Sequence, residues 1–209
     1  MKTAKTRTPP NRRRADVSVL KRTAQRCWAA PSETVPVFAP LDEKTVKSLK
    51  AGDNVLLSGT IYVARDAAHK RLIQYIKEGK ALPFNLRGAV IYYSGPTSAK
   101  PGRIIGSMAP TTSSRMDIYT PILLARGLKG MIGKGRRSPE VISAIKRYKA
   151  IYFTAIGGAA DLLSKYVKKA KSIAFTDLGP EAILELSVEN MPLIVTNDSK
   201  GGNFYERTI

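Results

Sequence analysis

The sequence predicts an α/β domain with a largely parallel sheet. From residue 41 onward, short apolar runs alternate with amphipathic segments whose apolar residues recur at three- and four-residue spacing. Such alternation is typical of parallel strands joined by helical crossovers. The chain has 209 residues, of which 43% are hydrophobic, so it is long enough to bury a sizeable core. We therefore expect one domain, with at most one appendage.

Six runs read as strands because they are apolar and rich in β-branched and aromatic residues. They span residues 54–64, 88–93, 130–133, 151–156, 172–175 and 192–196. The longest uncharged stretch in the apolar second half, residues 150–160, contains two glycines. It is far shorter than the roughly 20 residues that a membrane span needs, so we expect no transmembrane helix.

Four segments between these runs show helical spacing. They span residues 66–78, 114–125, 138–148 and 159–171. The third begins with Ser138 and Pro139, which is typical of a helix cap followed by a first-turn proline. One more short helix is expected to open at residues 179–181.

The first 35 residues differ in character from the rest of the chain. Residues 1–38 hold nine basic and two acidic side chains, and residues 2–14 lack large apolar side chains. Such a segment cannot bury enough surface to offset its ordering entropy, so residues 1–35 are expected to form a basic, disordered extension. A short helix at residues 17–28 is compatible with its pattern, and an organelle transit peptide is the less favoured alternative. Residues 36–209 form the expected domain.

The net charge of +19 indicates an anionic partner without specifying its kind. The chain has one cysteine, Cys27, and one histidine, His69. It cannot build an internal disulfide framework, nor a zinc or iron–sulfur site from its own thiolates alone. We therefore expect a cytoplasmic protein.

Three polar clusters fall at predicted strand-to-helix turns, where open α/β sheets usually bind ligands. They occupy residues 65–69, 110–115 and 133–137, and each offers at least one cation. The second cluster also places several hydroxyls at a helix start, which attracts anions. No P-loop or dinucleotide fingerprint is present. Two arginines and a lysine on converging loops would suit the two ends of a small dicarboxylate.

Each cluster also has a simpler structural explanation. Arg65 and Asp66 could form a surface ion pair, His69 could pack under a loop, and the hydroxyls could cap a helix. Residues 126–149 carry eight basic side chains and one acidic side chain, which leaves a nucleic-acid-binding protein as a distant alternative. Their aromatic residues are few, so a solvated or partner-facing surface is favoured over nucleic acid.

Six motifs, taken together and in this order, resemble one enzyme family. They are GTIYVARDAAHKRL (59–72), APTTSSRMD (109–117), MIGKG (131–135), GGAA (157–160), DLGPEAI (177–183) and PLIVTNDSKGG (192–202). The resemblance is to the beta subunit, or C-terminal domain, of class I iron–sulfur-dependent fumarate hydratase and its sibling L-tartrate dehydratase. It covers residues 36–209.

The resemblance implies a swivelling β/β/α fold and a hydro-lyase that is active only with an alpha subunit. The reaction would be the reversible hydration of fumarate to (S)-malate, with the conversion of L-tartrate to oxaloacetate as the alternative. A 4Fe–4S cluster would be held by the alpha subunit and not by this chain, and its iron would act as a Lewis acid on the substrate. The assembly would be a heterodimer or heterotetramer that binds a C4-dicarboxylate, without membrane or nucleic acid.

The resemblance also assigns site residues. Arg65, Arg115 and Lys134 would bind the substrate carboxylates. Thr111 would face the carbon that gains or loses the proton, so Thr111 and Lys134 are the expected catalytic residues. One departure is Ala109, where the family usually has glycine before Pro-Thr.

Overall fold

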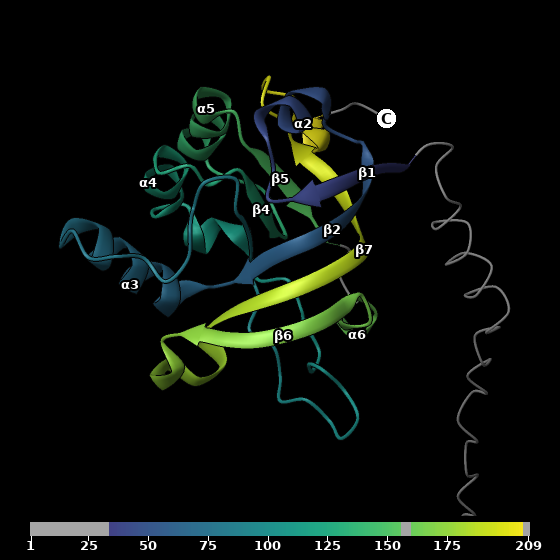
Figure 1. Ribbon diagram of the computed structural model, residues 1–209. Coiled ribbons are helices and arrows are strands. Elements are labelled where there is room, and N and C mark those ends of the chain that lie inside the picture. The colour runs from purple at the N-terminus through teal and green to yellow at the C-terminus, as the bar shows by residue number, and fades with distance from the viewer. Residues whose placement is uncertain (1–33, 156–159, 207–209) are drawn as a thin grey trace, which may run out of the picture. The chain divides into compact units, whose positions relative to one another are not determined.

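The computed structural model describes residues 34–155 and 160–206 (Figure 1). Almost all of the predicted basic extension, including the possible helix at 17–28, lies outside the described residues. The seven strands are β1 (Thr34–Ala39), β2 (Asn54–Val63), β3 (Val90–Tyr92), β4 (Gly130–Gly133), β5 (Ile151–Thr154), β6 (Val167–Ala174) and β7 (Ile183–Asn197). The α-helices are α2 (Glu43–Ser48), α3 (Asp66–Lys77), α4 (Thr120–Ala125), α5 (Pro139–Tyr148) and α6 (Ala160–Ser164). Three 3₁₀ helices complete the described elements: η1 (Ser113–Met116), η2 (Thr176–Glu181) and η3 (Phe204–Glu206).

The strands form one mixed sheet in the order β1-β2-β3-β4-β5-β7-β6. The pairs β1–β2, β2–β3, β3–β4 and β4–β5 are parallel. Strand β7 pairs antiparallel with β2, β5 and β6. The α/β prediction is therefore confirmed in its broad form. The sheet is parallel only in part, because the long strand β7 pairs with β5, β2 and β6 in the antiparallel direction.

Strand β7 closes the sheet on itself. It pairs with β2 along Leu184–Ile194 and with β5 through Ile194–Asn197. The strands β2, β3, β4, β5 and β7 thus form a ring of hydrogen-bonded neighbours, with β1 and β6 attached at its edges. In Figure 1, β7 crosses behind β2 and reaches β5 at its far end.

Two apolar layers hold this sheet. Successive residues of β3 point to opposite faces, so Val90 and Tyr92 join one buried cluster while Ile91 joins the other. The first cluster fills the space between the ring strands and α2. The second lies under α3, α4 and α5, which cover the other face of the parallel strands (Figure 1). The loops that follow β2, β3 and β4 therefore stand on a rigid base.

The predicted helix at 159–171 is wrong over most of its length. The structure has only α6 there, followed by β6, which pairs with β7 from Val167 to Ala174. The apolar residues between 162 and 170 fit helical spacing. The segment nevertheless forms a strand, because it pairs with β7 and its exposed lysines are typical of an edge strand. Residues 156–159, where this prediction meets the preceding strand, are outside the described part.

The short helix expected to open at residues 179–181 is also wrong, because the 3₁₀ helix η2 ends at Glu181 and β7 begins at Ile183. The remaining elements agree with the sequence prediction in kind and differ in length. The run at 192–196 is the end of β7, whose first nine residues were not predicted. Pro192 lies between the part of β7 that pairs with β6 and the part that pairs with β5, where one edge has no partner and proline is tolerated. The helix at 114–125 is split into η1 and α4, because Pro121 has no N–H to donate to the carbonyl of Asp117 and is tolerated only in the first turn of a new helix. Strand β1 and helix α2 were missed.

Candidate active site

The three polar turns predicted from the sequence follow neighbouring strands. Residues 65–69 follow β2, residues 133–137 follow β4, and residues 110–115 return to the end of β3. The return is fixed by the N–H of Thr111, which donates to the carbonyl of Tyr93 at 2.7 Å. Because these strands are parallel, their carboxyl ends meet at one edge of the sheet. The structure therefore brings all three turns together.

Arg65 stands at the start of α3 and is held by a carboxylate from a distant segment. Its Nε lies 3.2 Å from Oε1 of Glu181, and its side chain is 28% exposed. The other oxygen of Glu181 accepts from the N–H of Ala67 at 2.7 Å, which places a negative charge on the first turn of α3. The guanidinium also lies on Gly95, where an added Cβ would come within 2.6 Å of Cζ. A side chain at position 95 would therefore displace the guanidinium of Arg65 from this place.

Arg115 links the first turn to the second. Its Nε donates to Oδ1 of Asp66 at 2.9 Å, and its Nη2 donates to Oδ2 of the same carboxylate. Both side chains are partly exposed, Arg115 the more so at 53%. The predicted surface pair of Arg65 with Asp66 is therefore not formed. Asp66 binds Arg115 and Glu181 binds Arg65.

Thr111 and Lys134 belong to backbones that run side by side. The N–H of Lys134 donates to the carbonyl of Thr111 at 3.2 Å, and the N–H of Ser113 donates to the carbonyl of Lys134 at 2.9 Å. The side chain of Lys134 is exposed, whereas Thr111 is 9% exposed. Gly133 allows this approach, since a Cβ there would lie 2.0 Å from Oγ of Ser113. The pairing sets the hydroxyl and the ammonium on adjacent turns.

His69 lies beneath the first turn and is fully buried. Its Nδ1 lies 3.1 Å from the carbonyl of Arg65, so Nδ1 carries the proton and donates it. Nε2 has no hydrogen-bond partner, and the ring packs edge-on against Tyr93 at 5.2 Å. Burial lowers the pKa of His69 to about 4. The imidazole is therefore neutral at pH 7 and supports the start of α3.

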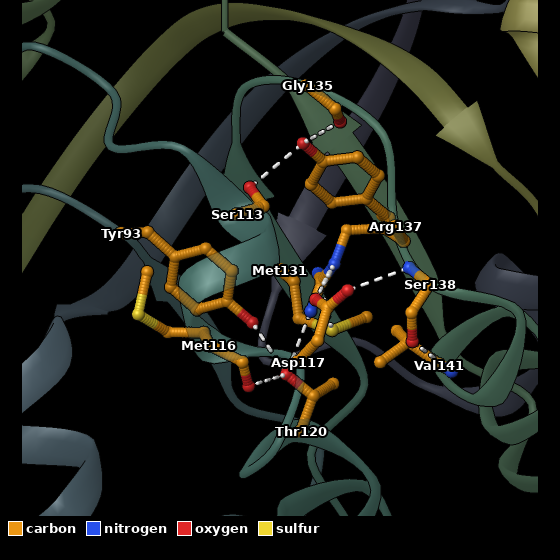
Figure 2. A network of polar contacts seen from close by, with 11 residues as sticks. Tyr93, Ser113, Met116, Asp117, Thr120, Met131, Gly135, Arg137, Ser138 and Val141 are labelled. Carbon is orange, nitrogen blue, oxygen red and sulfur yellow. Dashed lines mark hydrogen bonds and ion pairs between the residues drawn. The ribbon is translucent and has the colours of Figure 1, made fainter.

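Arg137, in the third turn, is a buried cation that the sequence analysis did not single out. Its side chain has no exposed surface, and its Nε donates to Oδ1 of Asp117 at 2.7 Å. Its Nη2 donates to Oγ1 of Thr120 at 2.8 Å. Figure 2 shows the guanidinium between Asp117 and the ring of Tyr93, with the next loop bound to the same carboxylate.

The sequence analysis identified the cations of the site but not the residues that hold them in place. Arg65, Arg115 and Lys134 were identified because cations on loops are visible in a sequence. Glu181, Asp117 and Tyr152 were not, because their partners lie far away in the chain. Arg137, just before the Ser138 cap, is likewise seen to be buried only in the structure.

No metal centre is formed by the part of the chain that the structure describes. Residues 34–155 and 160–206 contain no group of three or more His, Cys, Asp or Glu side chains that could hold an ion. They also contain no cysteine, since Cys27 lies outside them. This donor set does not fit a 4Fe–4S cluster, which needs thiolates. In the same described residues, no helix is long and apolar enough to cross a membrane.

The arrangement suits recognition of a small anion with two charged ends. Two guanidinium groups and one ammonium stand on three adjacent turns, and a buried hydroxyl lies next to the ammonium-bearing backbone. Guanidinium groups bind carboxylates through two parallel hydrogen bonds. These features define an α/β protein with three cationic side chains at the carboxyl edge of its parallel strands.

Comparison with known proteins makes this class specific. A family model described as the fumarase C-terminus matches residues 7–208. A provisionally named L(+)-tartrate dehydratase subunit beta from Methanocaldococcus jannaschii is 41% identical over 175 residues, covering 81% of this chain and 90% of its own length. The chain belongs to the fumarase C-terminus family.

Two further relatives carry fumarate hydratase names. Fumarate hydratase 2 of Leishmania major is 35% identical over 182 residues, covering 85% of this chain. The anaerobic class I fumarate hydratase of Escherichia coli is 38% identical over 155 residues, covering 73% of this chain. The matches span only 32% and 28% of those two proteins. The resemblance to this family is thus confirmed, and its named members are hydro-lyases. The family model begins at residue 7, earlier than the expected start at residue 36.

Proposed function

We propose that this chain is the beta subunit of a class I fumarate hydratase, which adds water reversibly to fumarate to give (S)-malate. The observation that carries the proposal is the meeting of Arg65, Arg115 and Lys134 on three adjacent turns in a member of this family. The match to nearly the whole of a beta subunit, but to less than a third of two fumarate hydratases, supports a two-subunit enzyme.

In this proposal the domain of residues 36–209 has a swivelling β/β/α fold and binds an alpha subunit as a heterodimer or heterotetramer. The closed strand ring, with helices over one face, supports that fold. The 4Fe–4S cluster belongs to the alpha subunit, because the described residues lack thiolates. Basic residues elsewhere on the chain are assigned to its surface and not to nucleic-acid binding.

The chain's own residues would bind and orient the substrate. Arg65 and Arg115 would bind carboxylate oxygens through their guanidinium forks, and Lys134 would add a point charge. When malate loses the proton next to a carboxylate, negative charge builds up on that carboxylate. Fixed cations at its oxygens lower the barrier, since they are already oriented before the charge develops.

Thr111 is the candidate for holding the proton that the substrate carbon gains or loses. Its backbone is fixed on both sides by hydrogen bonds to Tyr93 and Lys134. A free threonine hydroxyl is a very weak base, so a neighbouring group must take up its proton. Lys134 lies on the neighbouring backbone segment, and its ammonium would stabilise a deprotonated hydroxyl without accepting the proton. A carboxylate of the alpha subunit is the candidate acceptor.

An L-tartrate dehydratase is the second candidate, and the Methanocaldococcus relative favours it. Tartrate is malate with one more hydroxyl group, so the same cations would bind its carboxylates. The two substrates therefore cannot be told apart from Arg65, Arg115 and Lys134.

Anaerobic co-expression with a cysteine-containing alpha subunit tests the proposal. The purified complex is expected to hydrate fumarate, measured by loss of absorbance of its double bond. A complex that acts on L-tartrate alone would establish the second candidate. A complex inactive on both substrates, with its cluster intact, would overturn the proposed function.

A further inference from the structure

Each of the three polar turns sends one polar side chain into the core beneath it. These side chains are His69, Ser113 and Arg137, and all three residues are buried. They surround two buried tyrosine rings. The His69 ring lies 5.2 Å from that of Tyr93, and the Arg137 guanidinium lies 5.4 Å from Tyr93 and 5.0 Å from Tyr152. A polar and aromatic layer therefore underlies the cations that the solvent reaches.

Tyr152, on β5, joins the second and third turns through its hydroxyl. It donates to the carbonyl of Gly135 at 2.9 Å and lies 2.9 Å from Oγ of Ser113, which completes the bridge. Gly135 follows Lys134 directly, and Ser113 is two residues before Arg115. One hydroxyl thus contacts both segments close to their cations.

Arg137 makes a second link between the same two turns. Its guanidinium binds Asp117, and the other oxygen of Asp117 accepts from the N–H of Ser138 at 2.7 Å. Asp117 is two residues after Arg115, and Arg137 is three after Lys134. The two links therefore lie on both sides of Arg115 and just after Lys134.

We propose that Arg137 is a positioning residue that, together with Tyr152, fixes the spacing between the turns of Arg115 and Lys134. The inference rests on the proposed function, because it takes those two cations as the groups that bind the dicarboxylate. A buried ion pair adds little net stability compared with apolar packing, so stability alone does not account for it. The need for a fixed geometry accounts for the buried ion pair, because a ligand that is bound at both ends needs cations held at one separation.

Lysine cannot replace Arg137 in this role. The guanidinium reaches Asp117 through Nε and Thr120 through Nη2, which are two directions of one rigid plane. The ammonium of lysine keeps the charge, but it is a single donor group and cannot reach Asp117 and Thr120 in one fixed plane. Phenylalanine at 152 keeps the ring under Arg137 and removes only the hydroxyl bridge. Arg137→Lys and Tyr152→Phe are therefore mild changes that remove one link each.

Amide hydrogen exchange on the full chain tests the structural part without any catalysis. In Arg137→Lys and in Tyr152→Phe, residues 111–117 and 133–138 are both expected to exchange at least tenfold faster. Strands β2 and β7 should keep their protection. The matched control is Arg136→Gln, whose exposed guanidinium lies over Tyr205 and should leave both segments within twofold of the parent. Faster exchange in neither segment, or equally across the whole chain, would overturn the proposal.

A double-mutant cycle on the complex with the alpha subunit tests the link to the cations. Arg137→Lys is expected to lower kcat/KM for fumarate about 10- to 100-fold. In a Lys134→Met background the same change should cost less than threefold, because the cation that it positions is already gone. Full, independent losses in both backgrounds would refute positioning.

The hydrogen-exchange experiment and the double-mutant cycle together distinguish failure of this inference from failure of the proposed function. If the parent complex acts on neither fumarate nor L-tartrate, the function fails, and hydrogen exchange alone still decides whether Arg137 and Tyr152 fix the two turns. If the parent is active and the exchange of both segments is unchanged in the variants, the function stands and the positioning role falls.

Discussion

Arg115 reaches back across the sheet edge to grip Asp66, 49 residues earlier, with both sides of its guanidinium fork. The contact ties the start of α3 to the turn that precedes α4. It also means that the Nε–Nη2 edge of Arg115 is already bound to a carboxylate of the chain, so a substrate carboxylate would bind at the Nη1 side of the guanidinium. Asp66 holds Arg115 in one orientation, and a substrate carboxylate would approach a cation that is fixed beforehand.

We expect Asp66→Asn to lower kcat/KM for the dicarboxylate about tenfold, because Arg115 loses its fixed orientation. Stability should change by only about 0–1 kcal/mol, since the pair is partly exposed. Asp177→Asn is the matched control, because it breaks a similar exposed pair with Arg71 of the same helix. Tighter dicarboxylate binding by Asp66→Asn would show instead that Asp66 competes with the substrate.

The three cations are expected to be essential for turnover. Arg65→Met, Arg115→Met and Lys134→Met should each lower kcat/KM by roughly 30- to 1,000-fold, which corresponds to about 2–4 kcal/mol for one lost charged contact. Arg→Lys at 65 or 115 should not restore full activity, because an ammonium lacks the fork. Steady-state kinetics of the assembled complex give the measurement.

Two cations of the same basic stretch serve as controls for that series. Arg136→Met and Lys146→Met should cost less than about tenfold, since both side chains are exposed and act mainly through long-range attraction. Equal losses at site and control positions would mean that diffuse charge, and not a defined site, binds the substrate.

The buried imidazole of His69 makes stability depend on pH. Its folded pKa of about 4 lies below the ordinary value of 6.5, so the unfolded chain takes up a proton first as the pH falls. The stabilisation is fully present above pH 6.5 and is lost between there and pH 4, by up to about 3 kcal/mol. Urea unfolding across that range should show a shallower dependence for His69→Asn, whose amide can still donate to Arg65. If the free energy of unfolding changed with pH equally in the parent and in His69→Asn, the buried imidazole would not be the source of the pH dependence.

The isolated chain should bind no iron–sulfur cluster and show no hydratase activity. Its single thiol, Cys27, lies outside the described residues and cannot supply the ligands that a cluster needs. Cys27→Ala should therefore leave the complex with its alpha subunit active. Cluster absorbance together with turnover by the anaerobically prepared chain alone would contradict this expectation.

Deleting residues 1–33 should leave a folded domain that still assembles and turns over. The deletion ends there because β1 begins at Thr34 and pairs with β2 from its first residue. The basic, apolar-poor composition of the deleted segment is the reason for the expectation. Size-exclusion chromatography with the alpha subunit gives the readout, and loss of the complex would identify the segment as an assembly element.

Local sequence patterns predicted the parallel part of the fold well and the antiparallel part poorly. The run 130–133 coincides with β4, which is buried along its whole length, and the run 54–64 with β2, in which buried and partly buried residues largely alternate. Strand β6 carries lysines on an exposed edge, and its few apolar residues fit helical spacing equally well. Its pairing with β7 decides its structure, and no local window of sequence contains that pairing.

The same limit applies to the site. Arg65, Arg115 and Lys134 were found because their turns share a place relative to predicted strands. The pairs Arg65 with Glu181 and Arg137 with Asp117 join residues that are far apart in the chain, so spacing gives no sign of them. A resemblance to a family can carry over the residues that contact a substrate. The residues that hold those side chains became visible only with the structure.

The late position of β7 in the chain has a consequence for synthesis on the ribosome. Strand β2 is complete by residue 63, yet its antiparallel partner begins at residue 183. The ring cannot close until that last strand has left the exit tunnel, and contacts between such distant segments form slowly. Until then the turns of Arg65, Arg115 and Lys134 stand on an open sheet. We therefore expect the three turns to reach their final spacing only after β7 has left the tunnel and paired with β2 and β5.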